Sequence, residues 1–164
     1  MNARSKLVLA TCCALAGAAV ALSQSPPATP TPEQRAHRAV ELRQSVMQVQ
    51  AYSLRPAAAM LRKTPYDAAT VKQAAARLKM LSAMLGDVFK DDTSKFDVKD
   101  SAAKPEVWTD ASGFDNAVNE EVMAVDALES AAAGGDQDAT LKAIKAVGKS
   151  CGDCHDKFRK KEQG

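Results

Sequence analysis

Apolar residues recur at helical spacing in four stretches of the chain, and this repetition constrains the fold more than any other feature. In the first stretch Val40, Met47 and Leu54 lie seven residues apart, so they share one face of a helix. Three further stripes follow the same rule: Val71, Leu78, Leu81 and Leu85; Phe114, Val118, Val122, Val125 and Leu128; and Leu141, Ile144, Cys151 and Phe158. Four amphipathic helices with mostly short connections predict an all-α, antiparallel up-down-up-down four-helix bundle.

The ends of these helices carry recognisable start and stop residues. Thr31 precedes Pro32, which is the order of an N-cap followed by the first helical residue. Pro56 is expected to end or kink the first helix, because proline removes a backbone donor. The other expected boundaries are a start after Asp67, a long polar loop over 91–105, a start near Ser112, a stop at Gly134-Gly135 and a start at Asp136.

Composition excludes several classes of protein. Aromatic residues make up 4% of the chain, and the Ala-rich remainder is poor in strand formers, which argues against an all-β fold. The formal net charge is only +2, so a basic surface for nucleic acid is not expected. His37 and His155 are the only histidines, and no Ser/His/Asp arrangement, general acid or general base can be assigned. The sequence therefore predicts a protein that is not an enzyme and binds no nucleic acid.

The first residues have the pattern of a secretory signal peptide. Arg4 and Lys6 precede an almost wholly apolar stretch over 7–22, and prolines follow soon after it. An uncleaved membrane anchor is the alternative, but the apolar stretch is short for a bilayer span. Cys12 and Cys13 lie inside the stretch. The residues before them match a lipid-modification motif only imperfectly. We therefore interpret both cysteines as apolar residues of the signal peptide, which are removed when it is cleaved.

We therefore divide the chain into a signal peptide over 1–23, a Pro-rich tether over 24–32 and a helical bundle over 33–164. The tether holds four prolines among Ser, Thr and Ala and has no means of burying apolar surface. Cleavage predicts a periplasmic protein with no membrane attachment after the signal is removed. Cys151 and Cys154 are then the two remaining cysteines, in a compartment where thiols form disulfides or other covalent bonds.

Cys151, Cys154 and His155 form the pattern C-x-x-C-H, which is typical of c-type haem attachment. On a helix the residues at i, i+3 and i+4 share one face. Two thiols there can add to the two vinyl groups of a haem, and the imidazole of the next residue can reach the iron from the same side. Gly148 and Gly152 limit crowding beside the macrocycle. The motif predicts one covalent haem c enclosed by the bundle, with His155 as an iron ligand.

Other interpretations of these residues have less support. A redox dithiol would normally open a helix after a strand, whereas this motif lies deep in the last predicted helix. A structural zinc site would need further ligands. A haem-free structural bundle would leave the motif unexplained. His37 lies near the exposed start of the first helix, so we interpret it as a surface histidine and not as a second axial ligand.

Four further segments accompany the motif: Arg43-Gln44-Ser45-Val46-Met47, Thr64-Pro65-Tyr66-Asp67, Lys104-Pro105-Glu106-Val107-Trp108 and Cys154-His155-Asp156-Lys157-Phe158-Arg159-Lys160-Lys161. With a C-terminal C-x-x-C-H, this set resembles the cytochromes c prime, the class II c-type cytochromes, from about residue 33 onward. The resemblance implies a haem-enclosing bundle that exchanges electrons with unidentified redox partner proteins or binds NO or CO. It also implies homodimers formed through the first two helices, by analogy with the family alone.

The resemblance leaves two alternatives for the iron. In one branch of the family the iron is five-coordinate, an apolar side chain blocks the distal face, and the protein binds NO or CO. In the other branch a Met of the first helix is the sixth ligand, and the protein transfers electrons. The register of Arg43-Gln44 places Met47 at this distal position, and a thioether is a competent iron ligand. We expect electron transfer with His155/Met47 ligation; the alternative is a gas-binding protein in which Met47 only packs over the ring.

Three more residues are expected near the haem. Arg43 lies one turn before Met47 on the core-facing side, where a guanidinium needs an anionic partner. The resemblance implies that Arg43 and Gln44 contact the haem at its propionate edge. Arg159 follows His155 by one turn, and either screens the proximal pocket or is a cation at the helix C-terminus. Trp108 is expected to be a packing anchor at the start of the third helix.

Overall fold

The computed structural model describes residues 29–161. The predicted signal peptide and most of the predicted tether lie outside these residues. The described helices are, in order, α1 Pro32–Ala59, α2 Ala68–Ser82, α3 Leu85–Val88, α4 Glu106–Thr109, α5 Ala111–Gly134 and α6 Gln137–Phe158. The four long ones, α1, α2, α5 and α6, correspond to the four predicted helices. Within 29–161, no helix has the length and apolar content needed to cross a membrane.

The start of α1 lies where the sequence predicts it. The Thr31 hydroxyl accepts a hydrogen bond from the Gln34 N–H at 3.2 Å, and the Gln34 side chain accepts one from the Thr31 N–H at 2.9 Å. This reciprocal capping box fixes the first turn. Pro56 does not end α1, which continues to Ala59. Pro56 removes the helical hydrogen bond to the carbonyl four residues earlier, and α1 ends within one turn after it.

Side-chain caps also define the other long helices. The Asp67 carboxylate accepts hydrogen bonds from the N–H groups of the first turn of α2, and Asp136 accepts one from Ala139 N–H at 3.0 Å in α6. Gly135 ends α5 in the left-handed conformation, with φ of 75°. α5 begins at Ala111, one residue before the predicted start near Ser112, and Asp110 is its capping residue. Local capping chemistry therefore sets most helix boundaries.

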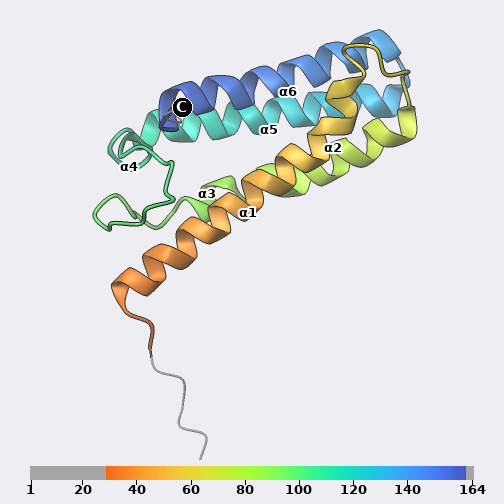
Figure 1. Cartoon of the computed structure of the whole chain (residues 1–164). Helices are drawn as coiled ribbons and strands as arrows, with labels where there is room; N and C mark the ends of the chain where they lie inside the picture. Colours follow the sequence, from red (N-terminus) through yellow and green to blue (C-terminus); the bar gives the residue numbers. More distant parts are fainter. Residues whose placement is uncertain (1–28, 162–164) are drawn as a thin grey trace, which may run out of the picture.

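The long helices form a bundle of two layers. In Figure 1, α5 and α6 run side by side above α1 and α2. Helices that follow one another pack together, α1 on α2, α2 on α5 and α5 on α6, whereas α1 and α6 touch only sparsely. The result is the predicted antiparallel up-down-up-down arrangement. The N-terminal half of α1, orange in Figure 1, diverges from α5 and α6.

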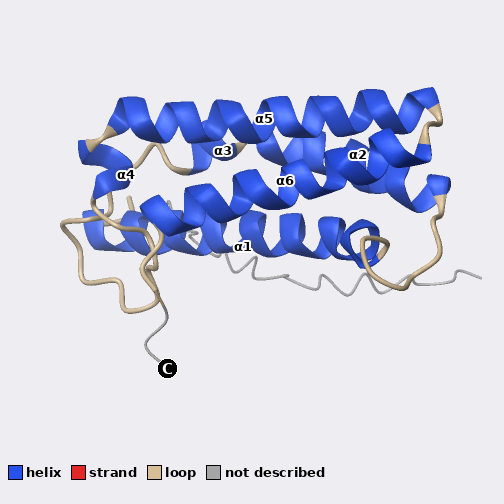
Figure 2. Ribbon diagram, turned by 90° about the horizontal axis from the view of Figure 1, so that it is seen from above, coloured by secondary structure: helices blue, strands red, loops and turns tan. Residues whose placement is uncertain are grey.

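One end of the bundle carries the irregular segments. The short helices α3 and α4, the loop between them and the C-terminal end of α6 all lie there (Figures 1 and 2). The loop is fixed to the last turn of α6 by backbone hydrogen bonds, from Lys104 N–H to Phe158 O at 2.9 Å and from Lys160 N–H to Ala102 O at 2.8 Å. The predicted polar connection over 91–105 is therefore ordered and covers this end of the bundle. We call it the cover loop.

The core has two parts of different character. We call the first the aliphatic half; it is built from Ala57, Met60, Val71, Ala74, Ala75, Leu78, Val125, Leu128, Ala132, Ala143, Ile144 and Val147. We call the second the motif half; its buried residues are Val46, Leu85, Val88, Val107, Phe114 and Phe158. Phe89 and Val118 pack against both clusters of the motif half and join them. The two buried phenylalanines, Phe114 and Phe158, therefore lie in the motif half.

Candidate functional site

The C-x-x-C-H motif lies in the last two turns of α6, at the boundary between the two halves of the core. Cys151 packs against the aliphatic half and Cys154 against the motif half. Both thiols are half-buried and free. Since α6 turns the i and i+3 positions toward the interior, the two sulfur atoms face the bundle as the sequence predicts.

The two thiols lie in an environment that disfavours their ionisation. Burial raises the pKa of Cys151 to about 12, and the adjacent Glu121 carboxylate adds to the rise through its charge and a hydrogen bond. Burial also raises the pKa of Cys154, with smaller contributions from the Glu121 and Glu120 charges. Both groups are therefore neutral thiols at physiological pH, apolar enough to lie against the core.

His155 follows the second thiol on the more exposed side of α6. Partial desolvation lowers the pKa of its imidazole, the Arg159 cation lowers it further, and Asp156 acts in the opposite direction. A lowered pKa favours the neutral imidazole, which is the form that binds a metal ion. The chemistry of His155 therefore suits the predicted role of iron ligand.

Met47 lies on α1, on the side of the motif half away from the thiols of α6. Its half-buried side chain packs against the cluster formed by Val46, Leu85 and Val88. Phe89 and Val118 belong to this packing and also to the packing around Cys154. Met47 and Cys154 therefore face one continuous apolar region from opposite helices, α1 and α6.

Arg43 is almost fully buried, at 4% exposure, but its partners in the structure are protein groups. Its guanidinium donates to the Thr93 hydroxyl at 2.7 Å and to the Asp91 carbonyl at 3.4 Å. It also lies 5.3 Å from the ring centres of both Phe89 and Trp108, within the range of cation–π attraction. Burial lowers the pKa of Arg43 and the Asp91 carboxylate partly offsets this, and a guanidinium stays charged under such shifts.

This arrangement makes Arg43 a clamp between α1 and the loop that follows α3. Trp108 takes part, since its Nε1–H donates to the Phe89 carbonyl at 2.8 Å. Trp108 is thus a packing anchor, as predicted, although it belongs to the separate short helix α4. The predicted contact between Arg43 and haem propionates stays a prediction beside these observed partners.

Gln44 and Arg159 also have partners in the loop that covers this end. The Gln44 side-chain amide donates to the Asp100 carbonyl at 2.7 Å. Arg159 caps α6, donating its backbone N–H to the His155 carbonyl at 3.0 Å, and pairs with Ala103 in an isolated β-bridge. Both residues therefore hold the loop against the ends of α1 and α6, and their predicted haem contacts stay predictions.

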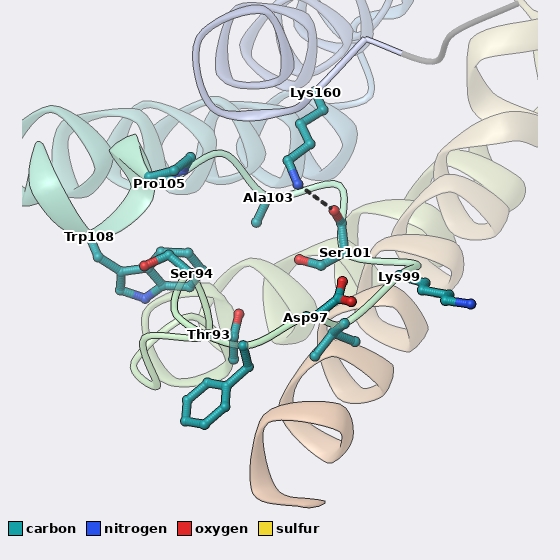
Figure 3. Close-up of a pocket in the computed structure, with 11 residues that line it drawn as sticks. Thr93, Ser94, Asp97, Lys99, Ser101, Ala103, Pro105, Trp108 and Lys160 are labelled. Atoms are coloured by element: carbon teal, nitrogen blue, oxygen red, sulfur yellow. Dashed lines mark hydrogen bonds between the residues drawn. The ribbon is translucent and has the colours of Figure 1, made fainter. Parts of the chain in front are cut away.

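A small cavity lies beside the Arg43 clamp. Figure 3 shows it between the loop and Trp108, with Lys160 reaching across to donate to the Ser101 carbonyl at 3.1 Å. Its volume is about 190 Å³ and its lining is largely polar, including Thr93, Ser94 and Asp97. Ligand pockets usually begin at about 300 Å³. The cavity is therefore smaller than a haem site and borders the motif half.

The sequence analysis missed one buried charged residue, Glu121. It is 5% exposed on α5, accepts a hydrogen bond from the Ser150 hydroxyl, and lies 3.4 Å from the Cys151 sulfur. The sequence contains a signal for this buried position. Positions 114, 118, 121, 125 and 128 recur every three or four residues, so they share one face of α5. The stripe predicted from the sequence contains Val122 instead, and the structure buries Glu121 more deeply.

The residues present fit a covalently attached haem. The motif supplies two free thiols one turn apart and an imidazole directly after the second. A Cβ added at Gly148 or Gly152 would meet no atom within 4 Å, and both glycines lie on the exposed side of α6 together with His155. Cys154 and Met47 border an apolar region rich in aromatic rings. This donor set and its surroundings suit a large apolar group with an iron centre.

Comparison with known proteins identifies several cytochromes as relatives. Residues 38–159 match the family described as Cytochrome C′. A cytochrome c′ from Cereibacter sphaeroides is 39% identical over 128 residues, which cover 77% of this chain and 85% of that protein. A cytochrome c-554 from Cereibacter sphaeroides is 31% identical over 127 residues, which cover 76% of this chain and 95% of that protein. The solved structure of a ferrous variant of cytochrome c prime from Alcaligenes xylosoxidans, with bound NO, superposes with a TM-score of 0.69 at 33% identity, covering 77% and 97%.

Proposed function

Because the chain belongs to the cytochrome c′ family, whose proteins bind a covalently attached haem c with iron, we propose that it is an electron-transfer protein. In this proposal Cys151 and Cys154 would form the two thioether bonds, and His155 and Met47 would bind the iron. The bound haem supplies a reversible one-electron change at its iron. The chain supplies the attachment, the two ligands and a largely apolar surrounding that excludes water.

The observation that carries the proposal is the position of Met47. It lies on α1 across from Cys154 on α6, and Phe89 and Val118 connect the packing of both residues. A thioether at that place is a soft ligand suited to haem iron, and it raises the reduction potential of the iron relative to stronger donors. Arg43 supports the position, since its guanidinium lies against the Phe89 ring one turn before Met47.

Gas binding is the second candidate function, and the relatives favour it. Variants of the cytochrome c prime of Alcaligenes xylosoxidans have been solved with bound NO and with bound carbon monoxide. If Met47 only packs over the ring, the iron of this chain has an open sixth position and can take such a ligand. The two functions differ in one contact, the bond between the Met47 sulfur and the iron.

The test compares two methionine variants of the full chain with its haem attached. Met47→Leu should convert a low-spin ferric spectrum to a high-spin one and let CO bind readily, because it removes the sixth ligand while keeping an apolar side chain. Met80→Leu is the matched control, since Met80 is 74% exposed on α2, and its spectrum should equal that of the wild type. Equal spectra for Met47→Leu and wild type would contradict the ligand assignment and favour gas binding.

We further propose that the protein acts in the periplasm after cleavage of residues 1–23. The apolar stretch behind Arg4 and Lys6 supports this, as does the need of the two thiols for haem attachment outside the cytoplasm. N-terminal sequencing of the mature protein should begin at Gln24, and osmotic shock should release it. A mature chain that begins at Met1 and stays with the membrane fraction would contradict the proposal.

The homodimer also stays a proposal. Leu42, Val49 and Tyr52 lie at i, i+7 and i+10 on α1, so they share one face, and they are 51%, 47% and 63% exposed. A second copy of the chain would cover this face. Sedimentation of the wild type should give twice the mass of one chain, and Val49→Glu should give the monomer mass. A wild-type monomer at high concentration would contradict the dimer.

A further inference from the structure

The buried carboxylate of Glu121 is not used by any step proposed above, although it touches the attachment site. Glu121 lies on the interior stripe of α5 and faces α6. Its two oxygens lie 3.6 and 3.4 Å from the Cys151 sulfur, and the Ser150 hydroxyl donates to the second of them. In the described part of the chain, no Lys or Arg pairs with it. A carboxylate held by neutral donors inside a core is costly.

Packing alone does not account for a glutamate at this place. The residues before and after it on the same stripe, Phe114, Val125 and Leu128, are apolar. Buried ionic groups can usually be replaced by apolar side chains of similar volume without loss of stability. An apolar residue at position 121 would therefore serve the bundle at least as well, and the reason for the carboxylate lies in its charge.

Attachment of the haem changes the surroundings of Glu121 in a defined way. The Cys151 S–H adds across a vinyl group: the sulfur bonds to one vinyl carbon, and the hydrogen goes to the other, with no net oxidation or reduction. The thioether sulfur no longer carries a hydrogen, so it no longer donates to Glu121. Ser150 is then the remaining donor, and the carboxylate lies beside the bond that joins haem and chain.

We propose that the Glu121 carboxylate lowers the reduction potential of the attached haem. A negative charge near the iron stabilises the ferric form over the ferrous form, because the ferric form carries one more positive charge, and the low dielectric of the core makes this interaction strong. The same negative charge already acts on both attachment thiols in the structure, because Glu121 contributes to the raised pKa values of Cys151 and Cys154. The inference rests on haem attachment through Cys151 and Cys154, as proposed above.

The chain offers a matched control in the adjacent residue. Glu120 carries the same side chain on the same helix but is exposed to solvent. Water and salt screen an exposed charge far more than a buried one. Glu121→Gln and Glu120→Gln therefore remove the same charge one residue apart, and only the first removes it from the interior.

The experiment is a spectroelectrochemical titration of the haem-loaded proteins at one neutral pH. Glu121→Gln should shift the midpoint potential upward, Glu121→Leu should do the same, and Glu121→Asp should keep it near the wild-type value. Glu120→Gln should leave it almost unchanged. If Glu121→Gln does not accumulate with haem, Glu121→Leu gives the answer, since it fills the site with an apolar side chain. Shifts no larger than that of Glu120→Gln would overturn the inference.

The pyridine haemochrome spectrum of each variant separates this outcome from a failure of the attachment itself. Two thioether bonds give a different band position from one or none, so the spectrum reports the state of Cys151 directly. Two thioethers with an unchanged potential in Glu121→Gln would contradict the role of Glu121 alone. A wild-type spectrum without two thioethers would contradict both the attachment and the inference built on it.

Discussion

The two halves of this bundle are built from different chemistry. The aliphatic half packs side chains such as Leu78, Leu128 and Ile144, each at most 1% exposed, between the four long helices α1, α2, α5 and α6. The motif half contains aromatic rings and a buried guanidinium, and there α1 diverges from α5 and α6. Glu121 and Cys151 lie where the two halves meet.

The difference indicates that the two halves of the bundle have different structural roles. Close aliphatic packing gives stability that depends on shape and volume alone. The motif half instead satisfies its polar groups through specific hydrogen bonds, such as Arg43 to Thr93 and Trp108 to Phe89, and joins the cover loop to α1 and α6. We conclude that the aliphatic half holds the helices together, and we expect the motif half to surround the haem.

The largest expected effect comes from removing the attachment chemistry. Replacing both Cys151 and Cys154 by Ala should leave almost no haem-loaded protein, because no covalent bond then holds the group. The unloaded chain should also unfold at a lower temperature, since the haem is a large apolar element of the motif half. Haem staining of denatured protein and thermal unfolding measure the two effects. Wild-type protein that loses all its haem in acidified butanone would contradict covalent attachment.

The next effect is a loss of stability without a change in the site. Leu78→Ala should reduce the free energy of unfolding by about 3 kcal/mol, because it leaves a cavity in the aliphatic half. The haem spectrum should not change. Leu61→Ala is the matched control at a position that is 43% exposed, and should cost little. Denaturant unfolding followed by circular dichroism measures both, and a spectral change in Leu78→Ala would argue against two separate halves.

A smaller effect is expected at the Arg43 clamp. Arg43→Met should cost about 2 kcal/mol, since the Asp91 carbonyl and the Thr93 hydroxyl lose a buried donor and two rings lose their cation. Unlike Leu78→Ala, it should also change the haem spectrum, because Phe89 packs beside Met47. Arg38→Met, at an exposed position of α1, is the control. Equal stability and equal spectra for the two variants would show that the clamp has no role.

The comparison also shows what could be predicted from the sequence. The long helices and their caps at Thr31, Asp67 and Asp136 depend on neighbours within four residues, so the sequence contains the signal. The short helices α3 and α4 have no side-chain hydrogen bond at their N-caps, so no local capping signal marks them in the sequence. The motif and Met47 were found by spacing and resemblance.

Contacts between segments that lie far apart in the chain could not be predicted from the sequence. Arg43 meets Thr93 and Trp108 across long stretches of chain, and no local pattern encodes that. Glu121 was missed because a stripe can be drawn through position 122 almost as well as through 121, and we favoured the apolar residue. Buried polar residues therefore need tertiary context, or close attention to the helical phase, before they can be recognised.

The central claim is that the motif half places Met47 as a ligand opposite His155, and the absorption spectrum of the wild-type protein tests it most directly. The ferric protein should be low-spin, with a weak charge-transfer band toward the red end of the spectrum, and the ferrous protein should bind CO slowly or not at all. A ferric protein that is already high-spin, with a ferrous form that binds CO readily, would contradict His155/Met47 ligation. Met47 would then be a packing residue over an open iron site.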